Sequence, residues 1–313
     1  MSLGREIYNN FRLATVFLLH LYVFTQNNGA VEKIIMIRKY ALVMFFFLAY
    51  LFTWANWLPQ ALTSRGIASI QVPDFLTILS GYGPALAAII VVSLAYGRQG
   101  LRELFGRLLR WRVGIQWYLI ALIMPAFVIL LAISINKWTG GASPDFSAAG
   151  FPFGPADTPL WQKLVILFLV FTLGFDGLGE EIGWRGFALP KLLEKHSMLR
   201  SSLILGALWA IWHFPYALTE GSALSDIPLH WFFIELLARS VIYTWIFINT
   251  NGSLLLPLLF HAAGNTTANL LPILPPATPD LRIYYYTIAI NCIIAIVISF
   301  LPRGNLQSGK QVV

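Results

Sequence analysis

The sequence is poor in cysteine and in charge. Its one cysteine, Cys292, lies in an apolar stretch, so no intrachain disulfide can form and cysteine usage leaves the redox compartment open. Charged residues make up 11 % of the 313 residues, and hydrophobic residues make up 58 %. A soluble domain has about 25 % charged and about 45–50 % apolar residues. The composition therefore excludes an ordinary soluble domain.

The charge that is present has a basic excess. The formal net charge is +7, which in a soluble protein would suggest a nucleic-acid partner. Here the basic residues stand in short segments between long apolar runs, which is typical of membrane proteins. The 11 tryptophans agree with this, because aromatic residues gather at membrane interfaces. We expect the lipid bilayer, and no nucleic acid, as a partner.

Long apolar segments predict about eight membrane-spanning helices. A helix needs about 20 predominantly apolar residues to cross the hydrocarbon core. Eight windows meet this need: residues 40–58, 75–96, 115–135, 160–178, 201–219, 229–249, 253–272 and 283–301. The expected fold class is all-α, a polytopic membrane helix bundle. Proline and glycine interrupt several windows, which is tolerated where neighbouring helices satisfy the freed backbone groups.

The first 35 residues differ from the rest. Their apolar part, residues 13–24, is short for a span and is typical of an interfacial or signal-like segment. Met36 is followed by two basic residues and then by a full span. We therefore predict an N-terminal extension at residues 1–35, interfacial or dispensable, and a single transmembrane domain at residues 36–313.

The positions of lysine and arginine predict the orientation in the membrane. Basic residues concentrate at one set of alternating segments: 33–39, 98–112, 185–200 and 303–310. The opposite set carries few of them: Arg65, Lys137, Lys163 and Arg282. Because cytoplasmic loops are enriched in lysine and arginine, we expect both termini in the cytoplasm. The localisation that follows is an integral protein of the cell membrane.

Three polar clusters interrupt the apolar sequence after residue 175. Ionisable residues inside a membrane are costly and are functional candidates by default. The clusters are Glu180, Glu181 and Arg185; then His213 in an aromatic run; then His261 and Asn265. Residues four apart share a helix face, so we expect the second glutamate to pair with the arginine. The first glutamate is rotated about 100° away and is free to point elsewhere.

The residue types predict hydrolysis of an amide bond without a covalent intermediate. A carboxylate among apolar groups suits a general base near neutral pH, which is the role we expect for Glu180. His213 would share a water with it and pass on a proton. The pair His261 and Asn265 could donate hydrogen bonds to a developing oxyanion. The sequence shows no serine in a nucleophile elbow, and Cys292 has no evident partner.

The same side chains could instead bind zinc. Two histidines, a carboxylate and a water form a known catalytic zinc site, and here the ligands would be His213, His261 and Glu180. The compact His-Glu-x-x-His arrangement is absent from the sequence. Spacing alone does not choose between a metal and a metal-free site.

Four further residues lie near the clusters in sequence. Asp176 stands one turn before Glu180 and could influence that carboxylate through its like charge. We interpret Trp184, Trp209 and Trp212 as packing around the site.

The three clusters together resemble the signatures of the CPBP family, which includes CAAX prenyl endopeptidases and bacterial Abi-like proteins. The family pattern is Glu-Glu-x-x-x-Arg, then Phe-x-x-x-His, then His-x-x-x-Asn. The matches are Glu180, Glu181 and Arg185 in the first motif, His213 in the second, and His261 and Asn265 in the third. The sequence departs from the pattern at Trp209, where the family usually has phenylalanine. The resemblance covers roughly residues 160–270.

The resemblance implies an eight-helix intramembrane protease with a membrane-associated, CAAX-type substrate. It implies that Glu180 activates water together with His213, and that His261 and Asn265 stabilise the oxyanion. It favours a metal-free glutamate mechanism, with zinc as the alternative. Two other functions compete with the protease: a proton-coupled secondary transporter, and a non-catalytic immunity or partner protein of the membrane. A transporter usually shows broken helices in two related halves, and the sequence shows no such pairing.

Overall fold

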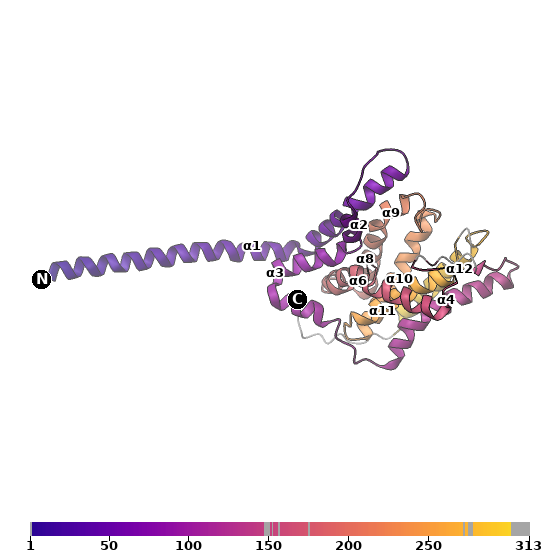
Figure 1. Cartoon of the computed structure of the whole chain (residues 1–313). Helices are drawn as coiled ribbons and strands as arrows, with labels where there is room; N and C mark the ends of the chain where they lie inside the picture. The colour runs from indigo at the N-terminus through magenta and orange to yellow at the C-terminus, as the bar shows by residue number, and fades with distance from the viewer. Residues whose placement is uncertain are drawn as a thin grey trace.

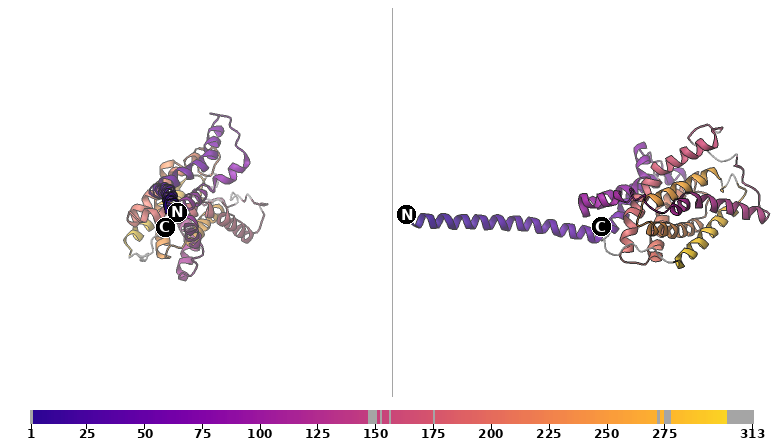
Figure 2. Two further views of the ribbon diagram at one scale, coloured as in Figure 1. Left: turned by 90° about the vertical axis from the view of Figure 1, so that its left-hand side faces the viewer. Right: turned by 90° about the horizontal axis from the view of Figure 1, so that it is seen from below.

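The computed structural model describes residues 2–146, 151, 153–155, 157–174, 176–271, 273–274 and 278–301, with side chains from residue 32 onward except 74, 77 and 78. Within these residues the chain is helical and has no strand, which confirms the all-α class. Figure 1 shows the helices from α2 onward and the C-terminal part of α1 gathered in one bundle, and Figure 2 shows the bundle from two further sides. In chain order the elements are α1 (Ser2–Ser64), α2 (Asp74–Ser80), α3 (Gly83–Gly106), α4 (Ile115–Trp138), α5 (Leu160–Leu173), α6 (Gly177–Gly183), the π-helix η2 (Trp184–Ala188), α7 (Leu189–Leu193), α8 (Met198–Trp212), α9 (Phe214–Leu218), α10 (Leu229–Asn249), α11 (Leu255–Leu270) and α12 (Arg282–Phe300).

Each of the eight apolar windows contains a helix, but the helices differ in length. Among the described residues, five segments are long and apolar enough to cross a membrane: Glu32–Ser64 of α1, and the helices α3, α4, α10 and α12. The remaining windows fall on α5, α8 and α11, which have 14, 15 and 16 residues. The structure thus shows a membrane helix bundle with five full-length candidate spans.

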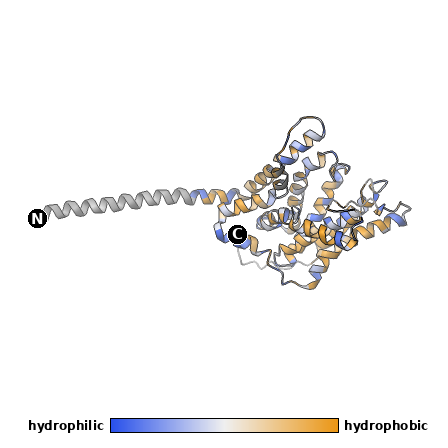
Figure 3. Ribbon diagram, in the orientation of Figure 1, coloured by the Kyte–Doolittle hydropathy of each residue, from blue (hydrophilic) through white to orange (hydrophobic). Residues whose placement is uncertain are grey.

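The outer surface of the bundle is apolar. Large hydrophobic side chains are exposed on several helices, for example Phe47 at 65 % on α1, Phe127 at 60 % on α4 and Ile293 at 61 % on α12. Figure 3 shows hydrophobic residues, in orange, along most helices of the bundle. A soluble monomer rarely exposes so much contiguous apolar surface, so this surface is suited to lipid.

Three predicted windows are broken by the fold. The window 75–96 is divided between α2 and α3, and the other two breaks lie beside predicted site residues. The window 160–178 does not form one helix: α5 ends at Leu173, and Gly174 is extended with ψ of −155°. The window 201–219 is divided at His213, which lies between α8 and α9. Pro215 stands in the first turn of α9, where its missing N–H costs nothing. Glu180 therefore lies on the short helix α6 and not at the end of a span.

The predicted boundary at residue 35 does not coincide with a helix end, because α1 runs from Ser2 to Ser64. The side chains before residue 32 lie outside the described part. Whether residues 1–35 are dispensable stays a prediction.

Glycines bring α6 very close to the start of α3. A methyl group on Gly179 would lie 2.4 Å from the carbonyl oxygen of Gly81, and one on Gly183 would lie 2.5 Å from that of Pro84. Small residues four apart allow helices in membranes to approach this closely. The two glycines flank Glu180 and Glu181, so the close contact also fixes the position of both carboxylates.

Candidate active site

Glu180 is almost fully buried, at 4 % exposure, and two tryptophans hold it. The indole Nε1 of Trp209 donates to its Oε2 at 2.5 Å, and that of Trp184 donates to the same oxygen at 3.2 Å. A buried carboxylate needs such donors, because an unpaired charge away from water is costly. Among the described residues, no hydrogen bond reaches the other oxygen, Oε1. That oxygen is available to a water molecule.

Glu181 points to different partners from Glu180, as its rotation on the helix predicted. Arg185 donates from Nη1 to its Oε1 at 3.0 Å, which confirms the pairing expected from their spacing. The ring of His261 lies on the same oxygen, with its Nδ1 at 2.8 Å. Since a carboxylate oxygen accepts, Nδ1 carries the proton and donates it. The bond between Glu181 and His261 joins α6 to α11, and spacing alone did not reveal it.

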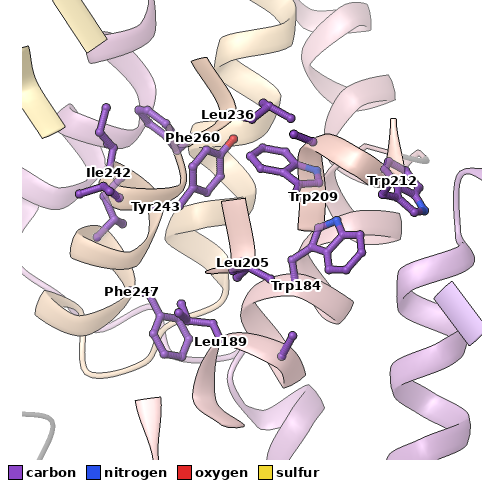
Figure 4. Close-up of a cluster of buried hydrophobic side chains, with 14 of the residues drawn as sticks. Trp184, Leu189, Leu205, Trp209, Trp212, Leu236, Ile242, Tyr243, Phe247 and Phe260 are labelled. Atoms are coloured by element: carbon purple, nitrogen blue, oxygen red, sulfur yellow. The ribbon is translucent and has the colours of Figure 1, made fainter. Parts of the chain in front are cut away.

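Arg185 is fully buried between two aromatic rings. Its guanidinium carbon lies 4.3 Å from the ring centre of Trp209 and 4.0 Å from that of Tyr243. Such stacking suits a planar guanidinium and offsets part of its desolvation. Figure 4 shows Trp209 and Tyr243 in the same buried cluster, on α8 and α10. The sequence analysis did not include Tyr243, because a tyrosine in an apolar span resembles core.

His213 is oriented by the backbone of its own helix. Its Nδ1 lies 2.9 Å from the carbonyl oxygen of Trp209, one turn earlier. A carbonyl only accepts, so Nδ1 must donate, and in the neutral ring Nε2 is left as the proton acceptor. The ring is packed against Trp212 and Phe232, with ring centres 4.7 Å and 5.4 Å away.

Asn265 is held by Asp176. Its Nδ2 donates to Oδ2 of Asp176 at 2.9 Å, between α11 and the residue that precedes α6. The amide nitrogen carries two protons, so one remains for a ligand. Asp176 was considered only for its influence on Glu180, and the structure shows that it also orients the asparagine.

Five of the six predicted residues lie around Trp209. The rings of His213 and His261 both have their centres 5.9 Å from that of Trp209. Glu180 and Arg185 contact it directly, and Glu181 is joined to it through Arg185. Asn265 lies one helical turn after His261 on α11.

The interpretation of the tryptophans as packing was incomplete, because two of the three also donate to Glu180. The four-residue spacing from Glu180 to Trp184 was a local signal that could have indicated one bond. The bond from Trp209 spans 29 residues and had no such signal.

An apolar pocket is lined by Phe232, whose ring also contacts His213. It has a volume of about 420 Å³ and lies between α8, α9 and α10. Its lining also includes Ala210 and Phe214. The pocket reaches the outer surface of the bundle at Ile211 and Phe214, which are exposed at 43 % and 45 %.

No metal site is formed by clustered ligands in the described part of the chain. There, no three histidine, cysteine, aspartate or glutamate side chains are grouped so that they could hold a metal ion. The alternative zinc set of Glu180, His213 and His261 stays a prediction.

Comparison with known proteins gives a match over the segment that contains these residues. Residues 161–267 match the family model described as type II CAAX prenyl endopeptidase, Rce1-like. A curated relative, CAAX prenyl protease 2 of Methanococcus maripaludis, is 26 % identical over 244 residues, which is 75 % of this chain and 86 % of that protein. The matched segment contains all six residues of the three motifs. The chain is therefore a membrane-embedded protease that is similar to the type II CAAX prenyl endopeptidases.

Proposed function

We propose that this endopeptidase cleaves a peptide bond in a membrane-associated, prenylated CAAX-type protein, with Glu180 as general base and His213 as its partner. The observation that carries the proposal is that a buried carboxylate and two oriented histidines surround Trp209, with an oriented amide one helical turn after His261. The match to CAAX endopeptidases supports the substrate class.

In the proposed reaction, Glu180 removes a proton from water through Oε1 while Oε2 stays on the indoles. The hydroxide adds to the scissile carbonyl carbon and gives a tetrahedral oxyanion. Nε2 of His213 relays the proton to the leaving amine nitrogen, the oxyanion returns its electron pair to the carbonyl, and the C–N bond breaks to release the amine. Transfer by a positioned group of this kind contributes about 10²–10⁴-fold to a rate.

The oxyanion would receive hydrogen bonds from Asn265 and His261. Asn265 has one amide proton left beyond its bond to Asp176. Nε2 of His261 can donate only if the ring carries both protons, because Nδ1 already donates to Glu181. The carboxylate of Glu181 supplies a negative charge beside that cationic ring. Such charge-assisted hydrogen bonds are roughly twice as strong as neutral ones.

The apolar pocket lined by Phe232 supports a lipid-modified substrate. A prenyl chain is an apolar chain of methyl-branched isoprene units, and its burial away from water is favourable. The pocket is apolar, and its residue Phe232 contacts the proposed relay His213, so the chain could anchor there while the peptide lies across Glu180.

The proposal is tested by cleavage of a prenylated CAAX peptide with purified protein in liposomes. Glu180→Gln and His213→Ala should each abolish cleavage, because they remove the proton acceptor or its relay. Glu194→Gln, a matched change in an exposed surface pair, should leave cleavage intact. Full activity of Glu180→Gln would contradict the proposal. Proton-coupled uptake by these liposomes without cleavage would favour a transporter instead.

We propose a metal-free mechanism. The support is that Oε2 of Glu180 and Oε1 of Glu181 are already occupied by protein donors. Chelator treatment of purified protein should leave kcat unchanged. Stoichiometric zinc, with activity lost on its removal and regained on its return, would contradict this and would make the histidines ligands.

We also propose eight spans with both termini in the cytoplasm of the cell. The three shorter helices α5, α8 and α11 complete the count, since short helices can cross where flanking residues or bilayer thinning compensate. The basic residues between α3 and α4 support the orientation.

A further inference from the structure

Trp209 contacts three residues of the proposed active site. Its Nε1 donates to Glu180, its carbonyl oxygen accepts from His213, and its ring stacks on Arg185. We propose that Trp209 is a positioning residue: it fixes Oε2 of the carboxylate so that Oε1 alone faces the water, and it aims His213 at the same water. This inference rests on the proposed function.

The hydrogen bonds that described residues make to Glu180 hold only one of its two carboxylate oxygens. Both indole donors reach Oε2, and none of the described residues donates to Oε1. A carboxylate without these bonds could rotate and offer either oxygen, so each productive arrangement would be less populated. Fixing a reacting group before the reaction lowers the entropy lost at the transition state.

The indole of Trp209 is itself held by its neighbours. The guanidinium of Arg185 covers one face of Trp209 at 4.3 Å, and the ring of Tyr243 meets it edge-on with ring centres 5.7 Å apart. Trp209 is 2 % exposed. A side chain packed in this way does not change rotamer easily, so its N–H is a fixed donor.

Trp212, which lies three residues later on the same helix, provides a comparison. Trp212 is 1 % exposed, and its ring centre lies 4.7 Å from that of His213. Its buried Nε1 has no hydrogen-bond partner among the described residues. The two tryptophans are thus matched in burial and both lie against His213, whereas only Trp209 donates to Glu180 and stacks on Arg185. Phenylalanine, which the family pattern has at position 209, cannot make that bond.

The experiment replaces each tryptophan by phenylalanine and measures kcat and KM in liposomes. Trp209→Phe should lower kcat about tenfold with KM within about twofold, because the lost bond orients the base and does not hold the substrate. Trp184→Phe should lower kcat less, since its bond is longer. Trp212→Phe should leave kcat unchanged. Thermal unfolding of each variant in detergent gives the folded fraction, by which the rates are corrected.

Equal losses of kcat in Trp209→Phe and Trp212→Phe would overturn the inference, because the effect would then come from packing. Unchanged kcat in Trp209→Phe would also overturn it. These results are distinct from failure of the proposed function, which would show as activity in Glu180→Gln. An inactive Glu180→Gln beside a fully active Trp209→Phe would leave the function standing and remove only the role of Trp209.

Discussion

His261 donates from Nδ1 to Oε1 of Glu181 at 2.8 Å, across 80 residues of sequence. The same oxygen accepts from Arg185 at 3.0 Å. The carboxylate of Glu181 therefore accepts hydrogen bonds both from Arg185 and from the proposed catalytic residue His261. All three side chains are buried, so each depends on the others for charge compensation.

This shared carboxylate leads to a prediction for Glu181→Gln. Glutamine keeps an acceptor oxygen but loses the charge, so the bond from His261 becomes weaker by about 1–2 kcal/mol. Because 1.4 kcal/mol is a factor of ten in rate, we expect kcat to fall about tenfold. The measurement is cleavage of the prenylated peptide.

Arg185→Met separates the two roles of that carboxylate. It removes the cation but leaves the bond between Glu181 and His261. The unfolding temperature should therefore fall, while kcat per folded molecule should change little. Breaking a buried pair typically costs about 3–5 kcal/mol. If Arg185→Met and Glu181→Gln lose kcat equally after correction for folding, the charge of Glu181 has no special effect on His261.

A second prediction concerns Asn265 and Asp176. Asn265→Ala removes a proposed oxyanion donor and should lower kcat about 10²–10³-fold with weak residual activity. Asp176→Asn keeps an acceptor for the amide of Asn265, so it should cost less than about tenfold. Both rates are measured on the same peptide. An Asp176→Asn loss as large as that of Asn265→Ala would show that Asp176 itself takes part in the chemistry.

A third prediction concerns the close contact of α6 with α3. Gly179→Ala places a methyl group 2.4 Å from a backbone oxygen of Gly81, so α6 must move together with Glu180. Overpacking of this kind costs about 1–3 kcal/mol. We expect a lower unfolding temperature in detergent and reduced cleavage.

The matched control is Gly106→Ala, at the end of α3, where an added methyl group meets nothing within 4 Å. Alanine is the better helix former by about 1 kcal/mol, so this variant should be as stable as the parent or slightly more stable. A Gly179→Ala protein with unchanged stability and activity would contradict the role given to the contact.

A fourth prediction concerns orientation. A reporter fused after residue 313 should read as cytoplasmic, because the basic residues flanking α3 and α4 favour the inside. As a control, a reporter in the loop between α4 and α5 should read as external. An external reporter after residue 313 together with a cytoplasmic reporter in the loop would show the opposite orientation. Two reporters on the same side of the membrane would contradict the proposed number of spans.

The sequence by itself determined the all-α helix bundle and the resemblance to CAAX endopeptidases. Apolar windows of span length leave few other folds for a membrane protein, because only helices and closed barrels satisfy their backbone in lipid. The four-residue spacing also determined the pair of Glu181 with Arg185, since that interaction is local on one helix.

Only the tertiary structure decided which partners the site residues have over long distances. The bond from Trp209 to Glu180 and the bond from His261 to Glu181 depend on how α8 and α11 pack against α6, and helical periodicity carries no information about that packing. The breaks at Gly174 and His213 were also not predicted from hydropathy, because the residues around them are as apolar as a span. The packing of α6 through Gly179 and Gly183 places Glu180 among the indoles of α8 and η2, and so determines which carboxylate oxygen is free.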